Sequence, residues 1–275
     1  MKHFYTISDC KKLHELINHG IRDFVSKNNL SKTFLLLSGG IDSVTCLYSL
    51  IEQGLDFTAI TFYFDGYIST DLQHVSVLED KLGFKCIKLK IPSKPDEIYL
   101  DINNAVKQCY AIYHRIRRVK CETIFALNYC KSIIPYGSNI ISASCGDNVI
   151  GYNKKTAMAC AKYGDESDQV FLLRDASKSI CEFNEIFSTD YNYYDPFRDP
   201  NIVSFLLNFT CKALNSSFPK SFFVNAYNEW HKEYKSYVMP VGFHKAGNET
   251  KMFEDIAKYY GYDNALRFFN GIAKK

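Results

Sequence analysis

Hydrophobic positions along the first half of the chain recur with two different spacings. Some segments repeat apolar residues every three to four positions, the spacing of one helix face, and others are short apolar or β-branched runs typical of strands. The two kinds of segment alternate, and Gly83 stands where a helix would end. The expected elements are helix 9–28, strand 33–37, helix 44–53, strand 58–64, helix 71–82, strand 85–91, helices 96–108 and 121–131, and strand 139–143.

This alternation predicts a parallel sheet with helices on both faces, because parallel strands need a crossover that is usually helical. After residue 143 the strand signal fades. A polar loop at residues 164–168 marks a soft boundary between residues 1–155, the α/β core, and residues 156–275, a helical part of the same domain. We therefore expect an α/β fold, a doubly wound parallel sheet with a mostly helical C-terminal half. The helices expected in that half are 202–214, 222–230, 250–260 and 264–273.

The first strand ends in a glycine turn that leads directly into a helix. Glycines let the backbone turn tightly and approach a ligand, and the helix presents unpaired N–H groups and the positive end of its dipole. We expect Ser38 and Ser43 to add hydroxyl donors and Asp42 to hold a Mg²⁺ that bridges phosphate oxygens. The turn therefore predicts a phosphate site that is neither a Walker A loop nor a dinucleotide turn. It reads Ser38-Gly39-Gly40-Ile41-Asp42-Ser43.

These six residues resemble the Ser-Gly-Gly-x-Asp-Ser signature of the PP-loop ATP pyrophosphatases, the adenine nucleotide alpha hydrolase-like superfamily with a HUP-like sheet. That superfamily includes asparagine, β-lactam, GMP and NAD synthetases and several tRNA-modifying enzymes. Its members cleave ATP between the α and β phosphates, and a nucleophile then displaces AMP from the adenylated substrate. The resemblance implies ATP and Mg²⁺ as cofactors. The phosphate-binding residues would be Ser38, Gly39, Gly40, Asp42 and Ser43.

Two later segments resemble asparagine synthetases and supply further site residues. Residues 141–152 are similar to the segment Ser-Gly-Glu-Gly-x-Asp-Glu-x-x-Gly-Gly, which places Asp147 on that family's second Mg²⁺-binding aspartate. Asp42 and Asp147 would then hold the metal together. Residues 229–233 resemble the segment with a pyrophosphate-contacting lysine, which Lys232 matches. A cation there would neutralise charge as the α–β bond breaks.

The resemblance spans roughly residues 32–244, including a stretch at 194–203 similar to Arg-x-Pro-Phe-Leu-Asp in which Asp199 can cap a helix. It implies an amide-forming ligase that adenylates a small-molecule carboxylate for attack by ammonia or an amine.

Two departures from asparagine synthetases stand out. The position of their catalytic glutamate falls near Ser144, and Asp147 and Glu122 are both candidate substitutes. We also expect no glutaminase domain with a cysteine at position two, because Lys2 stands here and the glycine turn begins at residue 38. Ammonia would come from solution or a separate glutaminase, or the substrate would carry the amine.

Two further features point to the carboxyl edge of the sheet. Asp65 follows the second strand, where contacts to adenine or ribose are expected. The basic run at residues 114–120, with Arg118 as its first candidate, could line the nucleotide or substrate pocket. It could also follow an RNA backbone, or be a solvated face.

Composition narrows the partners. A formal net charge of +3 is lower than expected for a protein that holds a long duplex. Ten cysteines without close Cys-x-x-Cys spacing or a secretory signal predict reduced thiols and argue against a zinc site. No run approaches the length of a membrane span, so we expect a soluble, cytoplasmic protein with no membrane partner.

Three functions remain open. The first is the asparagine-synthetase-like ligase described above. The second is a PP-loop nucleobase- or tRNA-modifying enzyme that activates a base carbonyl oxygen; RNA is the less favoured partner, because the cysteine pairs of several such enzymes are absent. The third is a degenerate protein that binds ATP without turnover.

Overall fold

The computed structural model of the chain describes residues 1–234 and 249–274. In this part of the chain, five strands form one sheet in the order β3-β2-β1-β4-β5, and all neighbouring strands run parallel. The chain moves outward from β1 to β3 and then continues on the other side of β1, as in doubly wound folds. The predicted fold class is confirmed. The strands are β1 (Thr33–Leu36), β2 (Thr58–Phe64), β3 (Lys85–Ile91), β4 (Asn139–Ile141) and β5 (Asn192–Tyr194).

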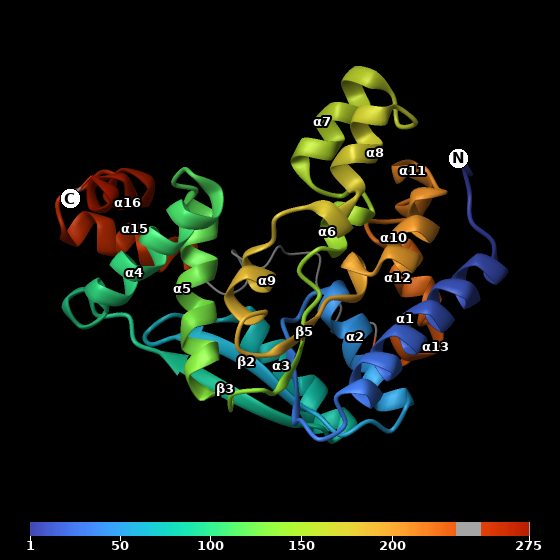
Figure 1. Ribbon diagram of the computed structural model, residues 1–275, viewed down its shortest axis with the longest axis horizontal. Helices are drawn as coiled ribbons and strands as arrows, with labels where there is room; N and C mark the ends of the chain where they lie inside the picture. The colour runs from blue at the N-terminus through green and yellow to red at the C-terminus, as the bar shows by residue number, and fades with distance from the viewer. Residues whose placement is uncertain (235–248, 275) are drawn as a thin grey trace.

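Helices flank this sheet on both faces (Figure 1). None of the helices in the described residues is long and apolar enough to cross a membrane. They are α1 (Ile7–Lys27), α2 (Ile41–Glu52), α3 (Thr70–Leu82), α4 (Pro95–Tyr113), α5 (Arg118–Ile133), α6 (Gly146–Val149), α7 (Lys154–Tyr163), α8 (Asp168–Arg174), α9 (Glu182–Phe187), α10 (Pro200–Leu207), α11 (Cys211–Leu214), α12 (Ser221–Ala226), α13 (Asn228–Tyr234), α15 (Glu249–Tyr259) and α16 (Ala265–Ala273), with 3₁₀ turns at Ala176–Lys178 and Pro196–Arg198.

Strand β1 shows how the two cores form. Leu35 packs with residues of α1, α2 and α12, whereas Phe34 packs on the opposite face with residues of α4, α5, α15 and α16. Alternate residues of a strand point to opposite faces, so an apolar strand such as β1 is buried on both. Each core contains residues from both halves of the chain, so the C-terminal helices cover the sheet that the N-terminal half forms.

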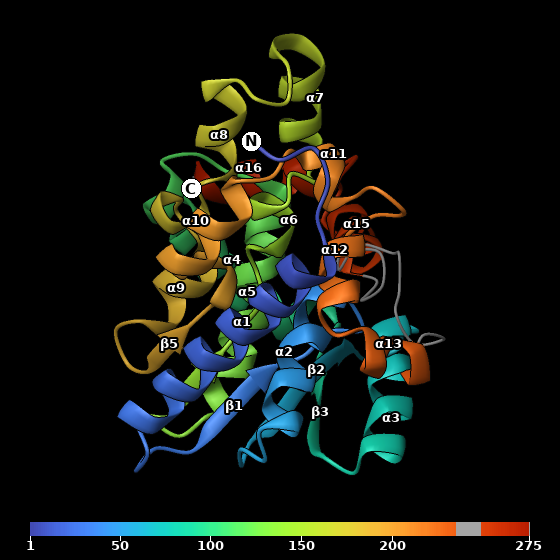
Figure 2. The same ribbon diagram turned by 90° about the vertical axis from the view of Figure 1, so that its right-hand side faces the viewer.

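The structure differs from the sequence prediction mainly after β4. A fifth strand, β5, forms the edge of the sheet. Its three residues are only partly buried, and they form no apolar run that would predict a strand from the sequence. The predicted helix 202–214 is two helices, because Thr210 accepts a hydrogen bond from the N–H of Ala213 and thereby begins α11. Helices α7 and α8 flank the predicted polar loop and project from one end of the molecule (Figures 1 and 2).

Candidate active site

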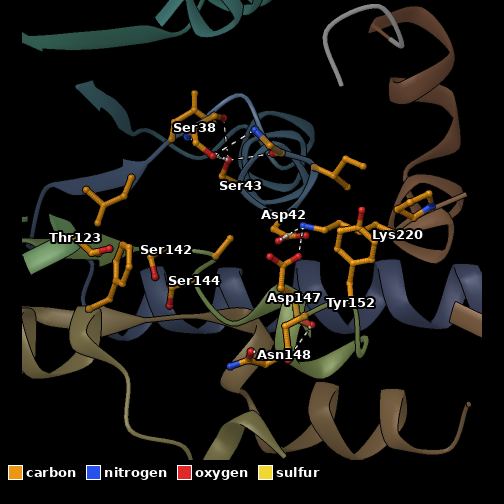
Figure 3. Close-up of a pocket in the computed structure, with 18 of the residues that line it drawn as sticks. Ser38, Asp42, Ser43, Thr123, Ser142, Ser144, Asp147, Asn148, Tyr152 and Lys220 are labelled. Atoms are coloured by element: carbon orange, nitrogen blue, oxygen red, sulfur yellow. Dashed lines mark hydrogen bonds and ion pairs between the residues drawn. The ribbon is translucent and has the colours of Figure 1, made fainter. Parts of the chain in front are cut away.

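A cavity of about 980 Å³ opens beside the turn that joins β1 to α2. Strand β1 lies between β2 and β4, where the strand order reverses and where open parallel sheets bind ligands. Ser38, Gly40, Asp42 and Ser43 line the cavity, and Asp147 projects toward Asp42 from α6, the short helix that follows β4 (Figure 3). The structure therefore brings the predicted phosphate turn and Asp147 together in one cavity of the size that small molecules occupy.

The backbone of the turn offers donors for an anion. Gly40 is the N-cap of α2 and has no side chain to accept from the helix, so the N–H groups of residues 41–43 have no partner in the described chain. All three residues line the cavity. The 12-residue helix α2 adds the positive end of its dipole at this point. These groups match the predicted phosphate cradle.

The hydroxyl groups of Ser38 and Ser43 stabilise the turn itself. Ser43 Oγ lies 2.9 Å from the carbonyl oxygen of Ser38 and 3.1 Å from that of Gly40, and it accepts a hydrogen bond from the Ser38 N–H. Ser38 Oγ lies 3.0 Å from Ser43 Oγ and accepts from the Gly40 N–H. These hydrogen bonds hold the loop closed, and the donation of both hydroxyls to a ligand stays a prediction.

Gly39 fixes the turn to α3 and is not among the residues that line the cavity. Its N–H donates to Oδ1 of Asp71 at 2.8 Å. Burial raises the pKa of Asp71 to about 6, and this hydrogen bond opposes the shift. A Cβ at Gly39 would lie 3.0 Å from Cβ of His74, so only glycine lets the loop approach α3 this closely. Gly39 thus fixes the position of the glycine turn against α3.

A lysine that no sequence motif indicated contacts both predicted metal ligands. Nζ of Lys220 lies 2.6 Å from Oδ2 of Asp42 and 2.6 Å from Oδ1 of Asp147 (Figure 3). Burial lowers the pKa of Lys220, but the two carboxylates outweigh that effect and raise it above its ordinary value. The side chain is therefore an ammonium ion placed beside the phosphate cradle.

Asp42 and Asp147 also suit a hard divalent cation. Oδ1 of Asp42 is buried and has no hydrogen-bond partner in the described chain, and 52% of the Asp147 side chain is exposed. Burial raises the pKa of Asp42 to about 6, an effect that the charge of Lys220 opposes, so the carboxylate form prevails at neutral pH. An unpartnered carboxylate oxygen next to an accessible second carboxylate fits the predicted Mg²⁺. When bound there with the nucleotide, the ion would offset charge on the pyrophosphate leaving group.

Behind the loop that follows β4, a serine and a buried carboxylate occupy the region of the missing glutamate. Ser144 lines the cavity, and its Oγ donates to Oδ2 of Asp195 at 2.8 Å. Burial raises the pKa of Asp195 to about 7, and the charge of Cys181 adds to the shift. A carboxyl group with a pKa near neutrality can exchange a proton through the serine hydroxyl. Glu122, the other suggested substitute, is fully buried, pairs with Arg118 and is not among the cavity-lining residues.

Another part of the cavity carries an ion pair in which Glu182 is buried and Lys120 is half-buried. Nζ of Lys120 lies 2.7 Å from each carboxylate oxygen of Glu182, and the hydroxyl of Tyr113 donates to Glu182 at 2.6 Å. Lys120 and Glu182 both line the cavity. The basic run therefore contributes to the site through Lys120 and not through Arg118, the residue selected from the sequence.

Besides Gly39, two more predicted site residues lie outside the cavity lining. Asp65 pairs with Lys90 at 3.0 Å, and Arg118 pairs with Glu122 and Glu254. Asp65 directly follows β2, and Arg118 is the first residue of α5. Neighbouring residues of opposite charge neutralise both side chains. The structure gives no support for contacts between these two side chains and a nucleotide in this cavity.

Lys232 lies on the rim of the cavity, where it pairs with Glu229 at 3.0 Å and keeps 64% of its side chain exposed. Its neighbour His231 lines the cavity too, is 2% exposed, and has no hydrogen-bond partner in the described chain at either ring nitrogen. Burial lowers the pKa of His231 to about 4, so the ring is neutral and can both donate and accept. Residue 244, where the resemblance ends, lies outside the described residues.

Comparisons with known proteins find local similarity. The chain is 26% identical over 135 residues to 7-cyano-7-deazaguanine synthase of two Leptospira interrogans strains, covering 48% of this chain and 54% of theirs. It is 41% identical over 63 residues to the enzyme of the same name from Methanoregula boonei, covering 23% and 26%. The chain thus spans about half the length of the Leptospira interrogans relatives and about a quarter of the Methanoregula boonei relative. No family model matches.

Three solved structures match the chain at low similarity. They are NMN synthetase from Francisella tularensis (15% identity, TM-score 0.36, 86% of this chain and 98% of that one), the U34-tRNA thiolase NcsA from Methanococcus maripaludis with its [4Fe-4S] cluster (14%, 0.38, 97% and 80%), and glutamine-dependent NAD⁺ synthetase from Acinetobacter baumannii in complex with ADP (12%, 0.34, 88% and 47%). Together with the glycine turn, the sequence matches make the chain similar to PP-loop ATP pyrophosphatases; they do not single out the asparagine synthetase branch.

Proposed function

We propose that this chain is an ATP-dependent enzyme that adenylates an oxygen atom of a nucleobase-like small molecule and releases pyrophosphate. The observation that carries the proposal is the set of unpartnered N–H groups at residues 41–43, which faces the same cavity as the Asp42–Lys220–Asp147 cluster. Donors of this kind suit phosphate oxygens, and the ammonium group suits the negative charge that grows on a departing pyrophosphate.

Different residues would bind the phosphates and the substrate, at two ends of the cavity. At the turn, the first N–H groups of α2 would bind the phosphates, and Lys220 would leave the carboxylates to contact the pyrophosphate oxygens. At the other end, polar and apolar side chains would enclose the substrate ring. The polar ones are Lys120, Thr123, Ser142, Ser144 and Glu182, and the apolar ones are Phe62, Val119, Leu127 and Phe183.

The curated relatives suggest the class of substrate. 7-Cyano-7-deazaguanine is a guanine-like base with a nitrile, and a nitrile carbon has the oxidation state of a carboxyl carbon. A carboxylate on such a ring could attack the α-phosphorus of ATP, so that pyrophosphate leaves. Ammonia would then attack the acyl carbon, AMP would leave, and one proton would pass to the protein. This scheme keeps the ammonia chemistry of the ligase hypothesis and changes the acceptor to a heterocycle.

Ser144 and Asp195 are the best placed groups to take that proton. Their 2.8 Å hydrogen bond connects the cavity wall to a carboxyl group with a pKa of about 7. A base of this strength is half ionised near neutral pH, which is the range where proton transfer to a protein group is most effective. The pair would replace the glutamate that asparagine synthetases use.

A product assay tests the proposal. The purified chain is incubated with ATP, Mg²⁺ and ammonium, together with a panel that includes carboxylated deazaguanines, aspartate and unfractionated tRNA. We expect AMP and pyrophosphate in equal amounts with a heterocyclic acid, and none with the Asp42→Asn variant. Asp65→Asn serves as the matched control, because Asp65 lies outside the cavity lining.

Each other outcome identifies an alternative. Turnover with aspartate alone would favour the asparagine-synthetase-like ligase, and strict dependence on tRNA would favour the RNA-modifying enzyme. ADP and phosphate as products would contradict adenylation. Tight nucleotide binding without any AMP across the panel would favour the degenerate ATP-binding protein.

A further inference from the structure

A group of metal-ligating side chains lies away from the active-site cavity, where α7 meets α11. It consists of Cys160 on α7, Asp165 in the loop that follows, and Cys211 at the start of α11. Their ligand atoms all lie within 4.8 Å of one another. Cys211 is buried, while Cys160 and Asp165 are partly exposed, so an ion has a path from solvent. None of the three lines the cavity described above.

The distances within this group are those of a tetrahedral zinc site. The two Sγ atoms are 3.8 Å apart, and Sγ of Cys160 is 3.7 Å from Oδ1 of Asp165. With Zn–S bonds of ~2.3 Å, Zn–O bonds of ~2.0 Å and tetrahedral angles, the expected separations are ~3.8 Å for two sulfurs and ~3.5 Å for sulfur and oxygen. An ion could therefore bind with shifts of a few tenths of an ångström.

The ligands are held in place by the surrounding backbone. Oδ1 and Oδ2 of Asp165 accept hydrogen bonds from the N–H groups of Cys211 (2.8 Å) and Lys212 (3.0 Å). The thiol of Cys211 lies against Gly151, where a Cβ would come within 3.0 Å of Cys211 Cβ and closer still to its Sγ. Gly151 also has a left-handed backbone with φ of 74°. Both features leave room for the sulfur and fix where it points.

The local charge also suits a dication. Two thiolates and one carboxylate carry three negative charges, and a zinc ion leaves one of them uncompensated. Arg174 is fully buried, interacts electrostatically with all three ligands, and donates to the carbonyl oxygens of Val149, Phe209 and Leu206. Because its donors are held by those carbonyls, the guanidinium stays in place and brings the total charge to zero.

The α7–α8 hairpin has a small apolar core of its own. Its own apolar cluster contains only Ala159, Val170 and Cys211 as buried members. Hairpins with so small a core are commonly stabilised by a metal or a covalent link. The hairpin also begins directly after Asp147 and Tyr152 of the active site, so its position affects that loop.

From these observations we propose that Cys160, Asp165 and Cys211 bind one zinc ion, with a water molecule as fourth ligand, and that this ion fastens the α7–α8 hairpin to α11. Each thiol releases its proton as the Zn–S bond forms. The sequence prediction had argued against zinc because close Cys-x-x-Cys spacing is absent. The two cysteines are 51 positions apart, and only the fold brings them together.

Metal analysis tests the site without reference to activity. Protein purified under reducing conditions is loaded with Zn²⁺, freed of excess metal and measured by mass spectrometry for zinc, with about one ion per chain expected. The Cys160→Ser/Cys211→Ser variant should lose the ion, and Cys10→Ser/Cys86→Ser, which removes two distant thiols, should keep it. Asp165→Asn keeps one oxygen that can accept from the N–H of Cys211 and loses the acceptor for the N–H of Lys212, and it should weaken zinc binding by at least about tenfold.

A spectroscopic readout on the unaltered chain guards against a variant that fails to fold. Co²⁺ added to metal-free protein should give sulfur-to-cobalt charge transfer in the near ultraviolet and the intense visible bands of a tetrahedral site, and Zn²⁺ should abolish both. Absence of these bands, zinc content unchanged in the double variant, or a Cys160–Cys211 disulfide in reduced preparations would each overturn the proposal.

Discussion

Gly146 determines where the carboxylate of Asp42 can lie. A Cβ at this position would be 2.7 and 2.8 Å from the two carboxylate oxygens of Asp42 and closer still to Cγ. Gly146 is helical and its φ is not positive, so alanine suits its backbone and the clash is the only penalty. The Gly146→Ala substitution therefore moves Asp42 without removing any functional group.

The size of the effect follows from the contact distances. Carbon–carbon contacts are normally ~3.5–4.0 Å, so the carboxylate must shift by about 1 Å. Such overpacking costs about 1–3 kcal/mol of stability. A shift of about 1 Å at a catalytic group can lower turnover by about 10²-fold. It would also break the 2.6 Å contact with Lys220, and we expect nucleotide affinity to fall about tenfold, or about 1.4 kcal/mol.

Calorimetric titration with Mg²⁺ and α,β-methylene ATP, which cannot be cleaved between the α and β phosphates, measures this affinity. Gly271→Ala is the matched control, because a Cβ there would lie 2.9 Å from Cε1 of Tyr262, in the C-terminal segment. Both variants should lose stability in urea, but only Gly146→Ala should lose affinity. If folded Gly146→Ala bound the nucleotide as tightly as the wild type, the assigned role of Asp42 would be wrong.

Three further variants test other parts of the site. Lys220→Met removes the charge that opposes protonation of Asp42, so nucleotide affinity should require a higher pH than in the wild type; titrations across the pH range check this, and an unchanged profile would contradict it. Lys232→Met should change affinity less than about threefold, because that side chain is exposed and paired with Glu229. Burial raises the pKa of Asp195 from 3.8 to about 7, so the folded protein binds more protons than the unfolded chain, and this group's contribution to stability falls as pH rises between those values. Asp195→Asn should remove about 2–4 kcal/mol of this decline in stability with pH. Urea unfolding at the two ends of this pH range measures the decline, and an equal decline in the variant and the wild type would refute the raised pKa of Asp195.

The glycine turn was predictable because its information is local. A strand, two glycines and a helix follow one another in residues 33–53, and hydrophobic spacing alone places the turn at the sheet edge. The hydrogen bonds that the Ser38 and Ser43 hydroxyls make within the turn were not predicted, since a sequence does not reveal that the loop bonds to itself.

The other site residues depend on tertiary packing. Lys220 contacts Asp42 although the two residues are 178 positions apart in the sequence. Lys220 has a left-handed backbone but is neither glycine nor asparagine, the residues that usually indicate this conformation. His231 and Lys232 are adjacent, yet one is buried in the cavity lining and the other is exposed, because successive helix residues differ in direction by about 100°. Motif matching selected a segment that lines the cavity, without resolving which of its side chains is buried.

A crystal structure with Mg²⁺ and α,β-methylene ATP is the most direct test of the central claim, that the turn after β1 holds the triphosphate. We expect phosphate oxygens within hydrogen-bond distance of the N–H groups of residues 41–43, with the Lys220 ammonium on the pyrophosphate portion. Phosphates bound elsewhere, or a turn whose N–H groups face no part of the nucleotide, would contradict it.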